Sequence, residues 1–315
     1  MERDFIGYGA QPPKINWPNK ARIVVSIVVN YEEGSELSFA FGDPIQEAYK
    51  EYPKAMPDGV RDLTNEQVYE YGARVGIWRV MRLLDKYDLK TTFHACGMAL
   101  ERNPDVARAA VDGGHEICTH GYRWVETSNM TEDEERAFIK KSVEAQREVC
   151  GQRPVGWYCR YGPGLRTRRL LMEEGGFEYD SDSVADELPF YAVVDGEPFT
   201  VVPYTIDVND MKFWANAAFG NGEDFSTYMI DAFDQLYEEG AETPKMMSIG
   251  LHPRIIGRPA RARALDRFFK HIRSHDDVWV ARRADIAAHW RQERPYEQPY
   301  SGPSGESLWI CNSPV

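Results

Sequence analysis

The sequence contains little cysteine, no long apolar run and no excess of positive charge. Its five cysteines form no Cys-x-x-Cys pair and no zinc-ribbon spacing, which argues against a disulfide framework and favours reduced thiols in a cytoplasm. No apolar run reaches the roughly 18 residues of a membrane helix. The net charge of -13 argues against binding of nucleic-acid phosphates or of an anionic membrane. We therefore expect neither a nucleic-acid partner nor a membrane partner.

The first residues also lack a signal-peptide pattern, because Met1 to Gly7 has no basic segment followed by an apolar one. We therefore expect a cytoplasmic protein. Apolar residues are plentiful: they make up 43% of the 315 residues and include 17 Tyr, 14 Phe and 8 Trp. This composition is sufficient for a full core. We predict one domain over residues 1–315, with an irregular lead at 1–20 and a tail from about 293 to 315.

Strand and helix patterns alternate along the chain. Ile23 to Val29 is an almost continuous β-branched run, typical of a strand buried on both faces. Capping boxes at 64–67 and 131–134 predict helices that run to about Tyr87 and Val149. Further strands and helices are predicted at 91–96, 104–112, 155–158, 167–174, 179–181, 200–203, 226–239, 246–251, 260–274 and 278–281. This alternation predicts a parallel sheet or an α/β barrel.

Four segments at predicted strand ends carry titratable or cationic residues. Glu32 and Glu33 directly follow the first strand, and the other segments span 119–124, 157–163 and 250–254. Because the carboxyl ends of parallel strands meet at one edge, we expect these segments to build a single site. Residues 34–63 form a long loop of the kind that often acts as a lid.

The order of these motifs resembles the polysaccharide deacetylase (NodB-homology) family, which implies a distorted (β/α) barrel. In that family the first motif supplies two acids, one a base and one a metal ligand; Glu32 and Glu33 take these places. The second motif has two metal-binding histidines four residues apart; His120 takes the first, and Trp124 stands at the second. Arg160 loosely fits the third motif. His252, after a leucine, fits the last.

The substitution at Trp124 argues against a metal site. A catalytic zinc is held by about three protein ligands, and Glu33 with His120 alone supplies two. We do not expect His94 or His252 to complete the set. The prediction is therefore a site with no metal and no cofactor.

The departures from the family pattern resemble one branch, the metal-independent allantoinases. The segments that carry this resemblance are 30–34, 120–124, 156–158, 203–210, 248–252 and 256–261, whereas Arg160-Tyr161-Gly162 departs from it. The resemblance implies a hydrolase of purine catabolism that opens a small cyclic amide, allantoin to allantoate, and assembles as a homotetramer.

Each candidate residue has an expected role under this reading. Glu32 is the base and His252 the acid that protonates the leaving nitrogen, while His120, Arg160 or backbone N–H groups stabilise the oxyanion. Glu33 either holds a neighbour such as His120 or Arg160, or orders its loop. The expected substrate contacts are Arg160, Trp124, Trp157, Tyr158 and Asn30, although core packing explains the two tryptophans equally well.

The remaining histidines and acids have structural interpretations. We expect His115 to form structural hydrogen bonds, and Asp207 and Asp210 to order their loop. His271, His275 and His289 are expected on solvated helix faces.

Three other functions fit the sequence. These are hydrolysis of another cyclic imide or lactam, metal-dependent N-deacetylation of a small acetylated sugar, and ligand binding by a catalytically inactive barrel.

Overall fold

Strand β1 (Ile23–Tyr31) lies at the centre of the structure, and all nine of its residues are buried. The structure is a computed structural model that describes residues 3–52, 54–214 and 219–297. Strands β2 (Thr92–Ala95) and β8 (Lys245–Leu251) flank β1 in parallel pairing. The first strand predicted from the sequence is confirmed, as is its burial on both faces.

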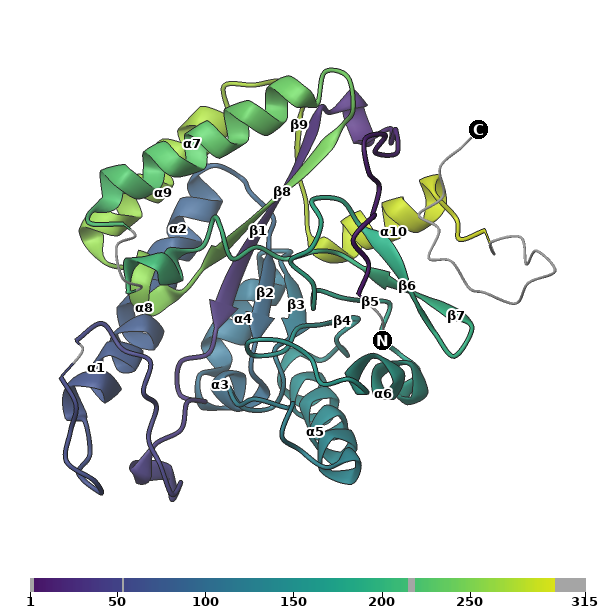
Figure 1. The fold of residues 1–315 in the computed structure, drawn as a ribbon. Coiled ribbons are helices and arrows are strands. Elements are labelled where there is room, and N and C mark those ends of the chain that lie inside the picture. Colours follow the sequence, from purple (N-terminus) through teal and green to yellow (C-terminus); the bar gives the residue numbers. More distant parts are fainter. Residues whose placement is uncertain (1–2, 53, 215–218, 298–315) are drawn as a thin grey trace.

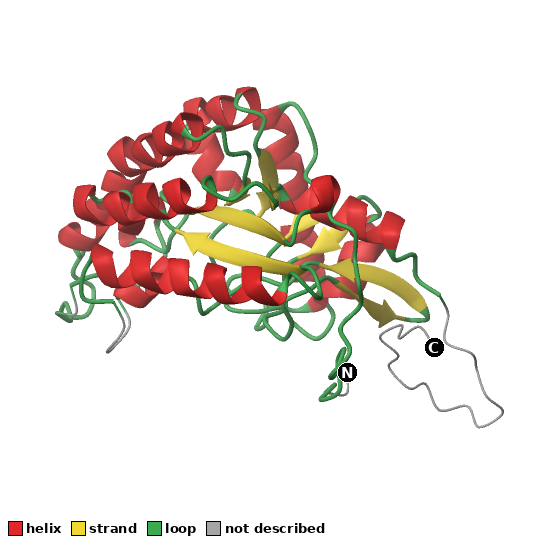
Figure 2. Cartoon of the chain, turned by 90° about the horizontal axis from the view of Figure 1, so that it is seen from above, coloured by secondary structure: helices red, strands yellow, loops and turns green. Residues whose placement is uncertain are grey.

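The sheet follows the order β6-β7-β5-β4-β3-β2-β1-β8, and β9 (Val278–Val280) pairs with the start of β1. Only the β6–β7 pairing is antiparallel among the described strands. The sheet curls into a half-barrel with the helices around its outside (Figures 1 and 2), which confirms the predicted α/β fold of the NodB type. The other strands are β3 (Glu116–Thr119), β4 (Gly156–Trp157), β5 (Tyr179–Asp180), β6 (Phe190–Val194) and β7 (Glu197–Val201).

Helices α1 to α9 lie between successive strands along the outside of the sheet, and α10 follows the last strand. The helices are α1 (Leu63–Tyr71), α2 (Ile77–Lys86), α3 (Gly97–Arg102), α4 (Pro104–Asp112), α5 (Glu132–Cys150), α6 (Thr167–Glu174), α7 (Gly222–Glu239), α8 (Pro253–Ile256), α9 (Pro259–Ile272) and α10 (Arg283–Glu293). No helix among the described residues is long and apolar enough to cross a membrane.

The two faces of β1 have different partners. Every second residue, from Ile23 to Tyr31, packs in the large apolar cluster shared with the outer helices. The residues between them point to the inside of the curled sheet, where Ser26 bonds a buried arginine and Asn30 reaches a cavity. Because side chains alternate between the two faces of a strand, Glu32, two residues after Asn30, also points to the inside of the sheet.

The predicted helix from 64 to 87 is interrupted. Asp62, rather than Thr64, caps α1, and a π-helical turn at Gly72–Gly76 separates α1 from α2. A Cβ at Gly76 would lie 2.1 Å from the backbone oxygen of Pro253. The π-helical turn therefore lies where the chain at Gly76 packs directly against the backbone of Pro253. The second capping box is confirmed, with Thr131 and Glu134 bonding reciprocally at the start of α5.

Helix α10 closes the inside of the half-barrel through Arg283. This fully buried side chain donates hydrogen bonds to the hydroxyls of Ser26, Ser181 and Ser248, and to the carbonyl oxygens of Val202 and Pro203. Most of the predicted tail, residues 298–315, lies outside the described residues.

Candidate active site

The predicted strand-end segments meet around one cavity of about 520 Å³. Its wall includes seven residues singled out from the sequence, which are Asn30, Glu32, His120, Trp124, Tyr158, Arg160 and His252. They follow or end β1, β3, β4 and β8, parallel strands of one stretch of the sheet, with β2 between β3 and β1, and the carboxyl ends of these strands share one edge. The geometry therefore brings together most of the predicted site.

Glu32 lies at the centre of the site and contacts three basic side chains. Its Oε1 lies 3.2 Å from Nε2 of His120 and 3.5 Å from Nε2 of His252, and its Oε2 lies 2.6 Å from Nη2 of Arg254. Burial alone would raise the pKa of this carboxyl, but the charges of Arg254 and His252, with hydrogen bonds from both histidines, hold it well below its usual range. Glu32 is therefore an ionised carboxylate in a dry environment.

His252 carries the proton that this arrangement needs. Its Nδ1 donates to Oδ1 of Asp210 at 2.6 Å, and its backbone N–H donates to Oδ2 of the same residue at 2.7 Å. Burial opposes the charge, but Glu32 and Asp210 outweigh it and raise the pKa of His252 to about 9. The imidazolium thus persists at neutral pH, with its Nε2–H facing Glu32 and the cavity.

Asp210 therefore does more than order its loop. It holds the ring of His252 in one orientation and keeps it charged, which is the positioning role that a carboxylate takes beside a catalytic imidazole. The sequence indicated only the loop, because the bond joins residues 42 positions apart.

Glu33 points away from the cavity and has a structural role. Its Oε1 accepts the backbone N–H of Arg254 at 3.0 Å, and its Oε2 accepts that of Glu32 at 3.1 Å. Burial, opposed by Arg254 and assisted by the charge of Glu32, raises the pKa of Glu33. Of the two roles left open by the sequence, the ordering of its loop matches these contacts. It bonds neither His120 nor Arg160.

Arg254 was missed as a site residue, although its segment was noted. The side chain is fully buried, and its guanidinium carbon lies 4.6 Å from the ring centre of Tyr69 and 5.0 Å from that of Trp124. It is the buried cation that offsets Glu32 and Glu33. Two adjacent buried acids require such a partner, and this requirement is the signal that could have identified it.

The metal implied by the family does not fit these residues. Both carboxylate oxygens of Glu33 accept backbone N–H groups, the ring of Trp124 occupies the second histidine position, and the guanidinium of Arg254 brings a positive charge to the same place. A divalent cation there would face a fixed cation and lack a third ligand.

Arg160 holds the loop formed by residues 34–63 against the cavity wall. Its guanidinium contacts both oxygens of Glu47, at 2.8 and 3.0 Å, and donates to the carbonyl of Trp124 at 2.8 Å. A second pair, Arg123 with Asp43 at 2.7 Å, holds the same loop. These contacts pair the charge of Arg160 with Glu47 and shape the cavity wall; the expected contact of Arg160 with the oxyanion stays a prediction.

Trp157 is not a substrate contact. Its ring packs edge-on against Phe138 and Phe177 in a separate apolar cluster, and its Nε1 lies 3.0 Å from Sγ of Cys159. The expectation of core packing is the correct one here. The next residue, Tyr158, faces the cavity instead and stacks on His120 with ring centres 4.9 Å apart.

Two further histidines lie within the fold, His94 next to this wall and His115 at the amino end of β3. His94, beneath Tyr158, is fully buried, and burial lowers its pKa well below the usual range. His115 accepts the backbone N–H of Thr91 through Nδ1 at 3.2 Å, as its structural interpretation predicted. Asn30 donates to the hydroxyl of Tyr204 at 2.8 Å, which fixes the amide in the wall.

Asp182 is the second residue that sequence reasoning missed. It lines the cavity between Ser181 and Ser183, and its Oδ1 accepts the backbone N–H of Cys159 at 2.7 Å. Its buried Oδ2 has no hydrogen-bond partner among the described residues. Burial and the neighbouring Asp180 raise the pKa of Asp182 to about 7. An acid directly after the short strand predicted at 179–181 was the available signal.

A carboxylate held between two imidazoles at the carboxyl edge of a curled, mainly parallel sheet defines a hydrolase with a deacetylase-type scaffold. Residues 63–179 match the family model described as polysaccharide deacetylase. A Schizosaccharomyces pombe protein provisionally named a polysaccharide deacetylase is 39% identical over 316 residues, covering 94% of this chain and 98% of its own length. The chain belongs to the polysaccharide deacetylase family.

Two solved structures are similar over almost the whole chain. One is a Pseudomonas aeruginosa PAO1 protein provisionally assigned as a polysaccharide deacetylase, with 51% identity, a TM-score of 0.90, and coverage of 94% of this chain and 100% of the other. The other is the Puue allantoinase, with 50% identity, a TM-score of 0.90, and coverage of 94% and 99%. The resemblance stated from the sequence motifs is confirmed.

Proposed function

We propose that the protein opens the ring of a small cyclic amide by hydrolysis, and that its substrate is allantoin, which it converts to allantoate in purine catabolism. The observation that carries the proposal is the contact of the Glu32 carboxylate with the protonated ring of His252 and the guanidinium of Arg254. Similarity to the Puue allantoinase supports the substrate.

The reaction uses one base and one acid. Glu32 accepts a proton from water as its oxygen attacks the ring carbonyl, and His252 donates its Nε2 proton to the ring nitrogen as the C–N bond breaks. The products are a carboxylate, a free N–H group and one released proton, and one water is consumed. The proton taken up by Glu32 passes back to His252, which restores both groups for the next turnover. When both ring nitrogens of His120 carry a proton, Nδ1 donates to the carbonyl of Tyr158 at 2.9 Å and Nε2 can donate to the developing oxyanion.

The cavity wall suits a flat, polar heterocycle. Tyr158 and Trp124 offer aromatic surface, and a volume of about 520 Å³ accommodates a small ring with one substituent. Asp182 offers an unpaired carboxylate oxygen that, when ionised, accepts an N–H of the substrate. Binding through Asp182 should therefore strengthen as the pH rises through about 7.

A second candidate is the hydrolysis of another cyclic imide or lactam. Tyr161, in the segment that departs from the allantoinase pattern, lies in the cavity wall with φ 60° and a 60% exposed side chain. A different side chain at this position would contact a different substituent on the ring. The same acid and base could therefore open a different cyclic amide.

A substrate panel decides between these functions. Purified protein would be assayed with allantoin, hydantoin, succinimide, dihydrouracil and N-acetylglucosamine, each with added Zn²⁺ and with chelator. Fastest turnover of allantoin, unchanged by chelator, supports the proposal. A preference for another ring identifies the second candidate, chelator-sensitive deacetylation identifies a metal-dependent deacetylase, and ligand binding without turnover identifies an inactive barrel.

We also propose a cytoplasmic location and a homotetrameric assembly. The four described cysteines (Cys96, Cys118, Cys150 and Cys159) are free thiols, as expected in a reducing compartment; Cys311 lies outside the described residues. Light scattering coupled to size-exclusion chromatography would test the assembly, and a monomer mass would contradict it.

A further inference from the structure

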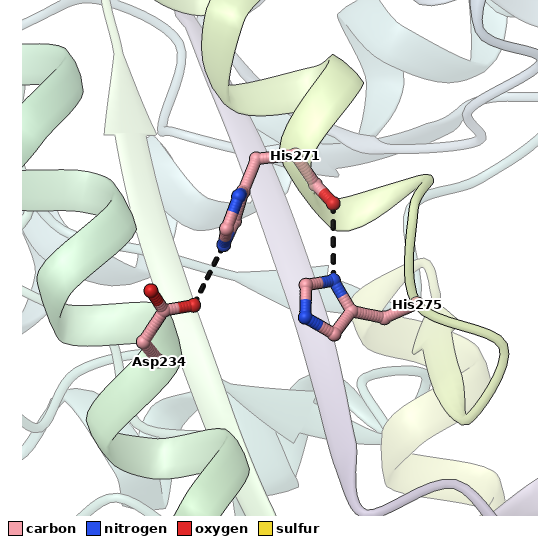
Figure 3. Close-up of side chains that lie close together, drawn as sticks. All are labelled: Asp234, His271 and His275. Carbon is pink, nitrogen blue, oxygen red and sulfur yellow. Dashed lines mark hydrogen bonds and ion pairs between the residues drawn. The ribbon is translucent and has the colours of Figure 1, made fainter.

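We propose a second site, for a divalent first-row transition-metal ion such as Zn²⁺, formed by Asp234 on α7, by His271 in the last turn of α9 and by His275 just after that helix (Figure 3). One ligand atom from each residue lies within 4.8 Å of the other two. The sequence led us to expect His271 and His275 on solvated faces. Their ligand atoms instead converge on a carboxylate from a neighbouring helix.

The site lies at the other end of the sheet from the hydrolytic cavity. Helix α9 starts soon after β8 and α8, at the carboxyl edge, and runs back toward the amino ends of the strands. His275 is two residues before Asp277, whose carbonyl accepts the backbone N–H of Arg22 just ahead of β1. The proposal therefore adds a site that is independent of the proposed hydrolysis.

The distances need only a small adjustment for a metal. Nε2 of His271 lies 2.6 Å from Oδ1 of Asp234, and the ligand atoms of all three residues lie within 4.8 Å of one another. Ligands bound at about 2.0–2.2 Å from a tetrahedral ion are roughly 3.3–3.6 Å apart. Side-chain rotations of about an ångström would separate His271 from Asp234 and bring His275 within range, with no change in the helices.

One ring is already oriented by a hydrogen bond outside the ligand set. Nδ1 of His275 lies 3.1 Å from the carbonyl oxygen of His271, which favours the tautomer protonated there. Figure 3 shows the other nitrogen of His275 on the side of Asp234 and the His271 ring. Such outer hydrogen bonds orient the metal-binding imidazoles of known sites.

Aromatic packing restrains both rings. The fully buried ring of Phe233 meets His271 and His275 edge-on, with centres 5.5 and 5.1 Å apart, and Tyr237 meets His275 at 4.7 Å. The entropy of ordering the two imidazoles is thus largely lost during folding, rather than when the metal binds.

The ligand set selects the class of metal. Two imidazoles and one carboxylate suit zinc, nickel or copper, whereas magnesium and calcium prefer oxygen ligands alone. All three residues are half-buried, so water can complete the coordination and the ion can exchange. A bound ion would join α7 to α9, which pack side by side against the core (Figure 1).

The test is calorimetric titration of Zn²⁺ into tag-free, chelator-stripped, full-length protein. We expect one zinc per chain at this site, with affinity at least tenfold weaker in Asp234→Asn, His271→Ala and His275→Ala. The control is His289→Ala, whose ring on α10 bonds the carbonyl of Asn16 and should leave zinc binding unchanged. Hydrolytic activity of His275→Ala should equal that of the unaltered protein.

His275→Ala keeps the proposal falsifiable, because it leaves the ion pair between Asp234 and His271 intact. Zinc should raise the melting temperature of the unaltered protein and of His289→Ala, and leave that of His275→Ala unchanged. Absence of zinc binding, or an affinity that all three ligand variants retain, would overturn the proposal. Failure of the substrate panel would leave it intact, because neither readout depends on turnover.

Discussion

Replacement of Asp210 by asparagine gives the sharpest test of the acid in the proposed reaction. An amide oxygen can still accept the backbone N–H groups of His252 and Ile256 that now bond the carboxylate at 2.7 and 3.2 Å. The negative charge 2.6 Å from Nδ1 of His252 is lost, and the amide nitrogen takes the place of Oδ1, where its N–H faces Nδ1. Both changes disfavour the protonated imidazole, so the proton affinity of His252 should fall.

The magnitude follows from the raised pKa of His252, about 9 against an ordinary 6.5. Asp210 is one of two acids responsible, so its loss should lower the pKa of His252 to roughly 7.5. At pH 8.5 the protonated fraction would then fall from about three-quarters to about one-tenth, an about eightfold loss of kcat/KM. At pH 6.5 the loss of kcat/KM should be less than about twofold, because His252 stays mostly protonated in the unaltered protein and in Asp210→Asn.

The assay is a pH profile of kcat/KM with the substrate that the panel identifies. The expected signature is an alkaline limb that moves from about pH 9 toward neutrality in Asp210→Asn. Asp207→Asn is the matched control, since that exposed acid bonds Tyr228 and Lys212, a residue of the cavity wall, and makes no hydrogen bond to His252. A limb that stays near 9, or a loss of the same size at every pH, would refute the reasoning.

Three other variants test the rest of the site. Glu32→Gln should lower kcat by about a hundredfold or more with an unchanged circular dichroism spectrum, and a near-normal rate would exclude Glu32 as the base. Asp182→Asn should abolish the rise of kcat/KM near pH 7; persistence of the rise would assign it to another group. Gly72→Ala should destabilise the fold by about 1–3 kcal/mol in urea titrations, because its Cβ would lie 2.5 Å from Oε1 of Glu33. An unchanged midpoint would show that Glu33 can shift freely.

Local patterns were sufficient to predict most of the fold and the position of Glu32 in the cavity wall. The β-branched run of β1 and the capping box of α5 act over a few residues, so the sequence shows them directly. The π-helical turn depends on the contact of Gly76 with Pro253, and a helical apolar stripe does not reveal such a contact. Hairpin β6–β7 was missed in part because its strands are only half-buried and carry a weak pattern.

Among the site residues, too, some roles follow from local sequence and others depend on contacts between distant segments. Trp157 and Tyr158 are adjacent and equally aromatic, yet alternation sends one into the core and the other into the cavity. The register that decides between them is set by pairing with other strands. Arg254 and Asp210 act through partners 222 and 42 positions away along the chain, so only the folded chain shows their roles.

Arg283 has a consequence for the order of synthesis. Its hydrogen-bond acceptors lie on β1, on β8 and in the segments after β5 and β7, so the earlier strands enclose polar hydroxyls and carbonyls until α10 arrives. An enclosed polar group without a partner costs roughly 1–3 kcal/mol. A nascent chain that has emerged from the ribosome only as far as β9 should therefore remain open and dependent on chaperones, and should acquire its rigid interior when the last described helix docks.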